Sequence, residues 1–218
     1  MSTQKKVAVI LSGCGVFDGA EIHESVFTLW AIAKSGASYT IFAPDVNQHH
    51  VINHLTGEES GETRNVLVES ARIARGKIQP LSDYKAANFD ALLLPGGFGA
   101  AKNLSSLAFD GPDCTVNSEV EQALKETHSA QKPIGALCIT PAVVAKVFGQ
   151  VEVTIGQDAG TAQAIEKMGG THTKTTHGEV VIDRANKIAT TPCYMLDATI
   201  DQIATGAANV VEATLKMV

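Results

Sequence analysis

The chain turns from a strand into a helix at Pro133-Ile134-Gly135-Ala136-Leu137-Cys138-Ile139-Thr140-Pro141. The apolar run at residues 133–137 predicts a buried parallel strand. Pro141 predicts the start of a helix, because the missing N–H of proline costs nothing in a helix's first turn. Cys138 therefore lies on a sharp strand-to-helix turn, where unpaired N–H groups and the helix dipole favour the thiolate.

Strands alternate with helices along the rest of the chain. We expect strands at residues 6–12, 39–43 and 89–94, a short one at 151–155, and a hairpin formed by 179–183 and 187–190. Helices are expected at residues 21–34 and 118–129, after Cys138, and in a last helix with apolar residues from Leu196 to Leu215. This order predicts an α/β fold with an open, mostly parallel sheet and helices on both faces. Ligands of such folds bind beyond the carboxyl ends of the strands.

Residues 45–80 differ from their surroundings because they are mostly polar, with one amphipathic stretch. We expect an excursion from the main sheet that covers a site or a dimer interface. Three histidines in it, His49, His50 and His54, favour a polar surface over a metal site, because no further spaced ligand joins them. With no repeat or linker, residues 1–218 form a single expected domain.

The composition excludes several classes of protein. Hydrophobic residues make up 44% and charged residues 18%, which indicates a globular chain. The net charge of −6 and the lack of a basic patch disfavour a nucleic-acid partner, because phosphate binding requires clustered Lys and Arg. No apolar run is long enough to span a bilayer, so no membrane association is expected.

The cysteines and the first residues predict a location. Cys14, Cys114, Cys138 and Cys193 are far apart, without a C-x-x-C pair or metal-type spacing, which favours reduced thiols over disulfides. Met1–Lys6 has no signal or transit character. We therefore expect a cytoplasmic protein that needs no metal or organic cofactor.

Two further features border Cys138 in the expected fold. The turn Pro95-Gly96-Gly97 ends the neighbouring strand, and its N–H groups can complete an oxyanion hole. Glu24 stands near the start of a helix that is apolar on most sides, where desolvation would raise its pKa and let it shuttle protons. The alternatives are an inert buried cysteine, an ordinary tight turn and a carboxylate that interacts with the helix dipole.

Several motifs in order and at the right spacing resemble the PfpI and parkinsonism-associated deglycase branch of the class I glutamine-amidotransferase-like superfamily. They are Val7–Ser12, His23-Glu24-Ser25-Val26, Leu94-Pro95-Gly96-Gly97, Lys102-Asn103-Leu104 and Ala136–Pro141. Two more stretches are similar to the isoprenoid-biosynthesis glyoxalases of the ElbB type, namely Leu11–Val16 and Asn53–Glu58.

The resemblance implies a flavodoxin-like fold, a homodimer and glyoxalase activity, that is, a cofactor-independent lyase. It implies Cys138 as nucleophile, Glu24 as its carboxyl partner, and Gly96, Gly97 and Ile139 around the oxyanion. Ile139 follows Cys138 where many relatives have a histidine, which disfavours a Cys–His–Glu triad and glutamine hydrolysis.

Three residues remain weaker candidates for the site. His172 and His177 are the downstream candidates for a base, and Cys14 is a candidate second thiol.

These features predict a glutathione-independent glyoxalase that converts glyoxal or methylglyoxal, small dicarbonyl substrates, to glycolate or lactate through a cysteine hemithioacetal. One alternative is a non-enzymatic redox-sensing or partner-binding protein that uses the same low-pKa cysteine. Another is a dinucleotide-binding protein, suggested by Gly13, Gly15 and Gly19 after the first strand. The acidic pair Asp18 and Glu21 disfavours it, because it would repel a pyrophosphate.

Overall fold

A seven-stranded sheet forms the centre of the protein, for which a computed structural model describes residues 4–218. The strands lie in the order β3-β2-β1-β4-β5-β9-β8, and all neighbours are parallel except β8, which runs antiparallel to β9. The strands of the sheet are β1 (Lys6–Ile10), β2 (Ser38–Ala43), β3 (Ile78–Pro80), β4 (Ala91–Leu94), β5 (Ile134–Leu137), β8 (Val181–Asp183) and β9 (Ile188–Thr191). A separate pair consists of β6 (Glu152–Val153) and β7 (Thr171–His172).

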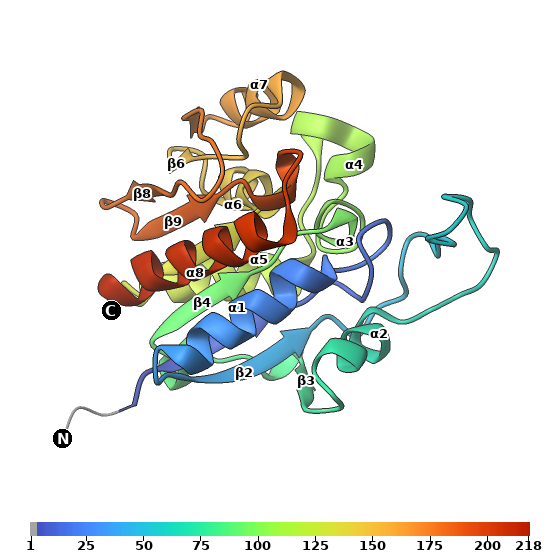
Figure 1. Ribbon diagram of the computed structural model, residues 1–218, viewed down its shortest axis with the longest axis horizontal. Coiled ribbons are helices and arrows are strands. Elements are labelled where there is room, and N and C mark those ends of the chain that lie inside the picture. Colours follow the sequence, from blue (N-terminus) through green and yellow to red (C-terminus); the bar gives the residue numbers. More distant parts are fainter. Residues whose placement is uncertain (1–3) are drawn as a thin grey trace.

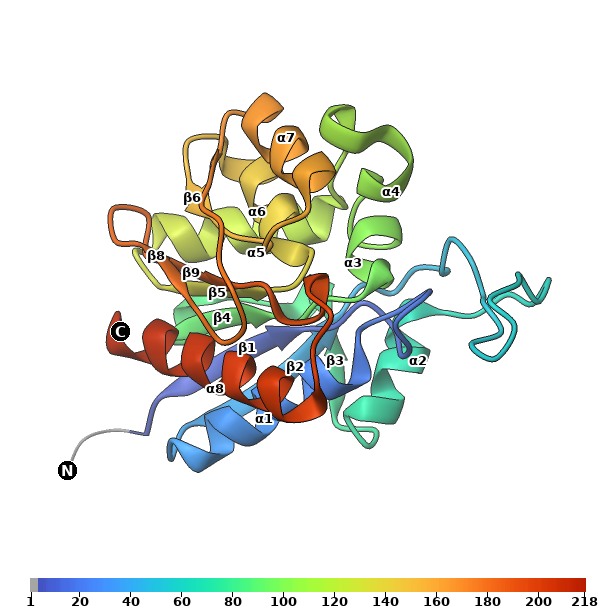
Figure 2. The same ribbon diagram turned by 45° about the horizontal axis from the view of Figure 1, so that its top comes forward.

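Helices cover both faces of this sheet (Figures 1 and 2). The α-helices are α1 (Ile22–Lys34), α2 (Val66–Ile73), α3 (Phe98–Lys102), α4 (Leu107–Asp110), α5 (Ser118–Ser129), α6 (Thr140–Phe148), α7 (Ala159–Lys167) and α8 (Ile200–Lys216). Short 3₁₀ helices are η1 (Leu81–Asp83), η2 (Ala86–Asn88), η3 (Gly111–Asp113) and η4 (Cys193–Met195). The expected α/β architecture, with a mostly parallel sheet, is therefore confirmed.

The alternation of side chains along β1 explains why the sheet has two apolar faces. Val7 and Val9 pack in the core beneath α1 and α8, whereas Ala8 and Ile10 pack in the core shared with α5 and α6. All four side chains are fully buried. Figures 1 and 2 show α1 and α8 side by side on one face. The buried sheet fixes the strand ends, and with them the loops that carry the candidate site.

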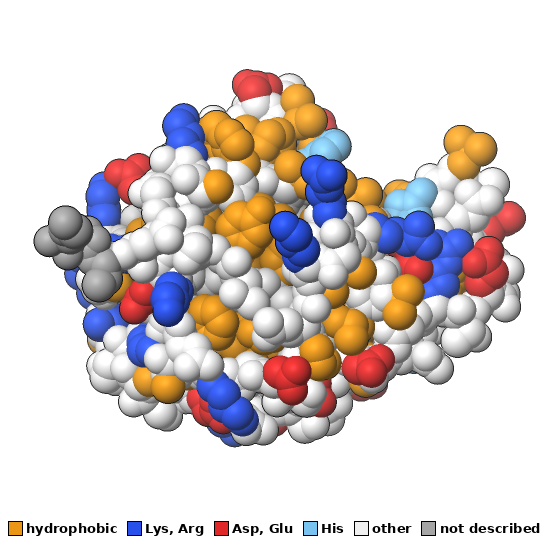
Figure 3. All heavy atoms as spheres, turned by 90° about the horizontal axis from the view of Figure 1, so that it is seen from below, with side chains coloured by type: hydrophobic (Ala, Val, Ile, Leu, Met, Phe, Trp, Pro, Cys, Tyr) orange, Lys and Arg blue, Asp and Glu red, His pale blue; other side chains and the backbone are white. Residues whose placement is uncertain are grey.

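The segment at 45–80 divides into two parts. Residues 49–64, which we call the arm, extend away from the body (Figures 1 and 3), and Leu55 in the arm is 93% exposed. The arm is fastened near its base, where the Ile52 N–H donates to Asp18 Oδ2 at 2.7 Å. Residues 66–80 instead form α2 and β3, which return to the edge of the sheet beside β2. The expected excursion is thus confined to the first half of this segment.

Two other element boundaries differ from expectation. The strand expected at 151–155 is only two residues long and pairs with β7 outside the main sheet. The last helix begins at Ile200 rather than near Leu196, because Thr199 forms a capping box with Gln202. Across residues 4–218, no helix combines the length and the apolar character that crossing a membrane requires.

Candidate active site

The turn after β5 holds Cys138 in a conformation that non-glycine residues rarely adopt. Its φ is +61°, in the left-handed region, and its N–H donates to the carbonyl of Thr191 on β9 at 2.9 Å. Pro141 lies in the first turn of α6, and the hydroxyl of Thr140 donates to the carbonyl of Pro95 at 3.0 Å. The turn is therefore tied to both neighbouring strands, and such strain is common at functional sites.

Glu24 is fully buried in the first turn of α1. Its carboxylate accepts two backbone hydrogen bonds, from Gly96 to Oε2 at 2.9 Å and from Tyr194 to Oε1 at 3.2 Å. Its own N–H donates to the side chain of Glu21, the N-cap of α1, at 2.7 Å. Glu24 thus lies where the ends of β4 and β9 meet the start of α1.

Gly96 allows the thiol and the carboxyl to meet. A Cβ added at Gly96 would lie 2.4 Å from Cys138 Cβ, 2.9 Å from Cys138 Sγ and 2.8 Å from Glu24 Oε2. The two functional groups consequently occupy the space that any other side chain at residue 96 would fill, and the thiol and the carboxyl lie next to each other there.

Burial changes the acidity of both groups. Desolvation, together with the charge of Glu21, raises the pKa of Glu24 to about 7. Desolvation and the neighbouring Glu24 carboxylate raise the pKa of the Cys138 thiol well above its usual value. The expectation of a low-pKa cysteine ionised by the helix start is therefore wrong, because the burial of the sulfur outweighs the N–H groups that face it. The resting sulfur is a thiol beside a proton acceptor.

The backbone donors divide between the two groups. The N–H groups of Gly97 and Ile139 lower the pKa of the Cys138 thiol, because they favour negative charge on the sulfur. The N–H of Gly96, which we expected at the oxyanion, is instead occupied by Glu24. Gly97 has a φ of +100°, and an added Cβ would collide with the backbone of Gly19 and Glu21, so its position also requires glycine.

Cys138 lies in the wall of a cavity of about 560 Å³. The exposed fraction of Cys138 is 7%. Segments from the loop after β1, from α3, α4, α7 and η4 and from the start of α6 enclose the cavity. Its lining residues include Val16, Phe98, Leu107, Ala164 and Tyr194.

The weaker candidates lie elsewhere. Cys14 is half-buried beside Glu69 and Arg72 of α2, and burial raises its pKa. His177 is exposed, and His172 on β7 contacts the N–H of Ile155 through Nε2 at 3.3 Å. None of these three lines the cavity of Cys138.

The described residues contain no cluster of three or more His, Cys, Asp and Glu side chains suited to a metal ion.

Tyr194 is a neighbour of the site that the sequence did not single out. It follows β9, donates its N–H to Glu24, lines the cavity and bonds through its hydroxyl with His23 Nδ1 at 2.8 Å. Cys193 beside it is buried, and desolvation raises its pKa well above the usual value. The sequence contained one indication that these two residues belong to the site, namely that both follow the carboxyl end of a strand.

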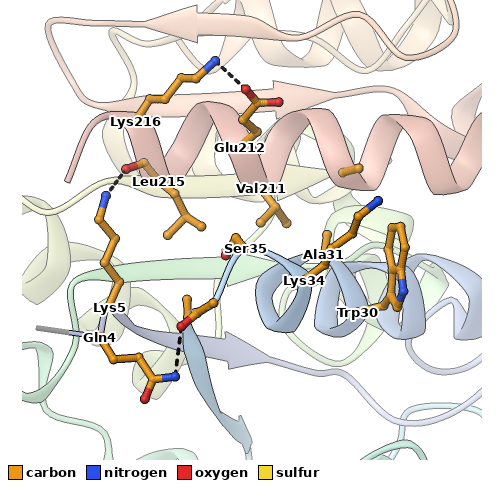
Figure 4. Close-up of a pocket in the computed structure, with 13 residues that line it drawn as sticks. Gln4, Lys5, Trp30, Ala31, Lys34, Ser35, Val211, Glu212, Leu215 and Lys216 are labelled. Carbon is orange, nitrogen blue, oxygen red and sulfur yellow. Dashed lines mark hydrogen bonds and ion pairs between the residues drawn. The ribbon is translucent and has the colours of Figure 1, made fainter. Parts of the chain in front are cut away.

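A second cavity, of about 550 Å³, lies between α1 and α8 (Figure 4). Its polar groups bond among themselves, since Lys5 Nζ donates to the Leu215 carbonyl and Lys216 pairs with Glu212. None of the residues that line it is shared with the cavity of Cys138. We therefore place the candidate active site at Cys138.

Sequence comparison places the chain beside two curated relatives. It is 51% identical over 222 residues to the human glutamine amidotransferase-like class 1 domain-containing protein 3, mitochondrial, covering 97% of this chain and 83% of the relative. It is 36% identical over 230 residues to the zebrafish ES1 protein, mitochondrial, covering 97% and 85%. No family model matches the chain.

Structure comparison gives the same fold. An isoprenoid biosynthesis protein with an amidotransferase-like domain from Ehrlichia chaffeensis has a TM-score of 0.91 at 38% identity, covering 98% of this chain and 100% of the other. Glyoxalase III from Candida albicans has a TM-score of 0.64 at 15% identity, covering 98% and 97%, a likeness of fold alone.

The expected cytoplasmic location is contradicted by these relatives. The human and zebrafish proteins are both named as mitochondrial, as is the rat ES1 homologue. The prediction depended on the absence of a recognisable targeting pattern in the first six residues, and that absence does not determine where the protein is found.

Proposed function

Because this chain belongs to the glutamine amidotransferase-like class 1 family that includes the ES1 proteins, we propose that Cys138 and Glu24 form the active site of a glutathione-independent glyoxalase. Its substrates are small 2-oxoaldehydes such as methylglyoxal, and its products are 2-hydroxy acids. The observation that carries the proposal is a buried thiol and a buried carboxyl that border the same space at Gly96, with the pKa of the carboxyl raised to about 7.

The first step forms the nucleophile at the moment of attack. Above pH 7 Glu24 is a carboxylate, and it accepts the thiol proton as Cys138 Sγ bonds to the aldehyde carbon. The alkoxide that forms on that carbon takes the proton back from Glu24. The N–H groups of Gly97 and Ile139, which face the sulfur, stabilise the developing negative charge. The result is a neutral hemithioacetal and a free carboxylate.

The second step moves hydrogen between adjacent carbons. Glu24 removes the proton from the carbon bonded to sulfur, which leaves an enediolate with its negative charge on the oxygen of the neighbouring carbon. That oxygen takes the proton of the hydroxyl on the sulfur-bearing carbon, and Glu24 returns its own proton to the neighbouring carbon, so the former aldehyde carbon becomes a thioester. Water then cleaves the thioester, releasing the hydroxy acid and restoring the thiol. One aldehyde carbon is oxidised and its neighbour reduced, so the sequence is balanced without an external electron carrier.

The redox-sensing alternative receives less support from the site. Oxidation to sulfenic acid proceeds from an accessible thiolate, whereas Cys138 is buried and its pKa is raised. An aldehyde that enters the cavity can still reach the sulfur, because the carboxylate removes the proton during attack.

The test uses the purified full chain with methylglyoxal, measuring substrate loss and lactate formation. We expect Cys138→Ala to reduce kcat/KM at least about 1000-fold, whereas Cys114→Ala, at a buried cysteine that is not among the residues lining the cavity, keeps wild-type turnover. Glu24→Gln should lose a similar factor. Wild-type turnover should rise as pH increases through about 7, where Glu24 ionises.

The isotope distribution tests the proton route. In D₂O we expect deuterium at C2 of the lactate, because a proton held on Glu24 exchanges with solvent. Turnover by Cys138→Ala at the wild-type rate would contradict the proposal.

A further inference from the structure

The cavity beside Cys138 is much larger than the smallest 2-oxoaldehydes. Methylglyoxal fills roughly the space of three water molecules, at about 30 Å³ each. The cavity measures about 560 Å³, within the range of sites that bury most of a drug-sized ligand. A substrate that reacts at the sulfur therefore has room to carry a substantial further group.

The walls of the cavity are mainly apolar. Apart from the glycines and Cys138, eight of the lining residues have apolar side chains: Val16, Phe98, Ala101, Leu107, Ala108, Ile139, Ala164 and Met195. Phe98 is 49% exposed, so part of this apolar surface lies open to solvent while no ligand covers it. An apolar group bound here would remove both its own surface and that of the wall from water.

Two of the three polar side chains in the wall, those of Asp158 and Tyr194, are already bonded to the protein. Asp158 caps α7 by accepting the N–H of Thr161 at 2.7 Å, and the Tyr194 hydroxyl bonds with His23 at 2.8 Å. Among the residues that line the cavity, none is Lys or Arg. Lys102 on α3 lies outside the lining and donates to the carbonyl of Phe17 at 3.1 Å. The wall thus offers little to a phosphate, a carboxylate or a chain of hydroxyls.

We propose that this cavity binds an apolar substituent of the molecule that Cys138 attacks, so that the preferred substrates are 2-oxoaldehydes with an alkyl or aryl group rather than glyoxal or sugar-derived dicarbonyls. The inference builds on the proposed function and names its substrate class. It follows from the juxtaposition of the reactive sulfur and an apolar cavity far larger than the reacting carbons need.

The first experiment compares kcat/KM for methylglyoxal, propylglyoxal and hexylglyoxal, with the polyhydroxylated 3-deoxyglucosone as the polar comparator. We expect about a two- to fourfold gain for each added methylene, the fold-change that corresponds to at most about 0.8 kcal/mol per buried CH₂. Hexylglyoxal should therefore exceed methylglyoxal by about 30-fold or more, and 3-deoxyglucosone should fall below it.

The second experiment measures chain preference without turnover. The rates at which iodoacetamide and N-hexyliodoacetamide alkylate Cys138 are each divided by their rates with free N-acetylcysteine. We expect the hexyl reagent to react about tenfold or more faster after this correction, because its chain occupies the cavity.

Filling the cavity should abolish both preferences. Ala164→Phe on α7 and Ala108→Phe on α4 place a ring in the wall, and Ala108 is exposed, so the fold tolerates the larger side chain there. Ala162→Phe is the matched control, on the same helix as Ala164 but outside the lining. Two ratios report the preference: kcat/KM for hexylglyoxal over that for methylglyoxal, and the corrected alkylation rate of N-hexyliodoacetamide over that of iodoacetamide. We expect both ratios to fall toward one in the first two variants and to stay at the wild-type value in the control.

The outcomes separate the two proposals. If methylglyoxal is turned over but the two iodoacetamides alkylate Cys138 at equal corrected rates, the proposed substrate class is overturned and the glyoxalase function remains. Chain-dependent alkylation without any Cys138-dependent turnover overturns the glyoxalase function and leaves the apolar binding site. Equal corrected alkylation rates for the two reagents in the wild type contradict the inference, whatever the turnover. So does a loss of the hexyl preference in Ala162→Phe as large as that in Ala164→Phe and Ala108→Phe.

Discussion

Cys138 stores strain at a single residue. Its φ of +61° is a conformation that costs a non-glycine residue of the order of 1 kcal/mol, and glycine adopts it freely. The same angle directs the sulfur toward the Glu24 carboxyl and the N–H groups of Gly97 and Ile139. The geometry of the nucleophile is therefore maintained against a local energetic preference by the packing around it.

A pair of substitutions measures that strain. We expect Cys138→Gly to be more stable than Cys138→Ala by about 1 kcal/mol, since glycine relieves the φ strain. The control is Cys114, whose φ is −57°. There Gly should be less stable than Ala by about 0.5–1 kcal/mol. Urea unfolding of the four variants gives both differences, and the same order at both positions would contradict the interpretation.

Glu24 links the stability of the fold to pH. Its pKa is about 7 in the folded protein against an ordinary value of 4.5. Between these values the unfolded chain releases the proton and the folded chain keeps it, so stability falls as pH rises through this window and levels off above 7. We expect Glu24→Gln to gain stability relative to wild type by on the order of 3 kcal/mol from pH 4.5 to 8.

The control for that measurement is Glu59→Gln, a carboxyl of the exposed arm. Urea unfolding at a series of pH values should give parallel curves for this variant and wild type. A constant offset between Glu24→Gln and wild type across the range would show that Glu24 titrates normally.

At the scale of elements, the start of α1 carries the candidate acid–base group. Glu21 caps the helix by accepting the N–H of Glu24, and its own N–H donates to the Gly96 carbonyl at 2.9 Å. The cap thereby ties α1 to the turn after β4, and the charge of Glu21 raises the pKa of Glu24. One residue both positions the neighbouring carboxyl and makes it a better proton carrier near neutral pH.

Glu21→Gln separates these two effects, because glutamine can still accept the capping hydrogen bond but carries no charge. We expect the pH midpoint of Cys138 alkylation to move below about 7, with a stability loss within about 1 kcal/mol. Glu62→Gln in the arm serves as the control and should leave the midpoint in place. An unmoved midpoint in Glu21→Gln would mean that burial alone sets the acidity of Glu24.

At the scale of the whole molecule, the arm and the sheet should differ in local stability. The arm contains a single isolated bridge, between Ile52 and Glu59, and most of its residues are exposed, whereas β1, β4 and β5 are almost entirely buried. By hydrogen exchange we expect amides of residues 53–63 to exchange within seconds, and those of the central strands only on global unfolding. Equal protection of arm and sheet would indicate a partner on the arm.

That this chain forms a homodimer, as its family resemblance implies, stays a prediction.

The sequence predicted the turn at Cys138 because its signals are local, namely an apolar run, a cysteine and a proline three residues later. For Glu24 the apolar helix around it left two interpretations open, a desolvated carboxyl and a carboxylate that interacts with the helix dipole, and the structure shows the carboxyl fully buried. The protonation state of the thiol was not accessible, since it depends on how deeply folding buries the sulfur. Tyr194 and the apolar cavity were missed for a related reason. The residues that line the cavity, Tyr194 among them, come from separate segments of the chain that only the topology brings together.

The contact between thiol and carboxyl has a consequence for the surrounding solvent. Passing a proton from Cys138 to Glu24 is a tautomerisation, so the buried pair carries one negative charge before and after the nucleophile forms. No counter-ion has to enter and no buffer molecule has to collect the proton. The proton transfer that activates the thiol therefore takes place between two neighbouring groups, and the pH of the solvent acts on it by determining whether Glu24 is ionised.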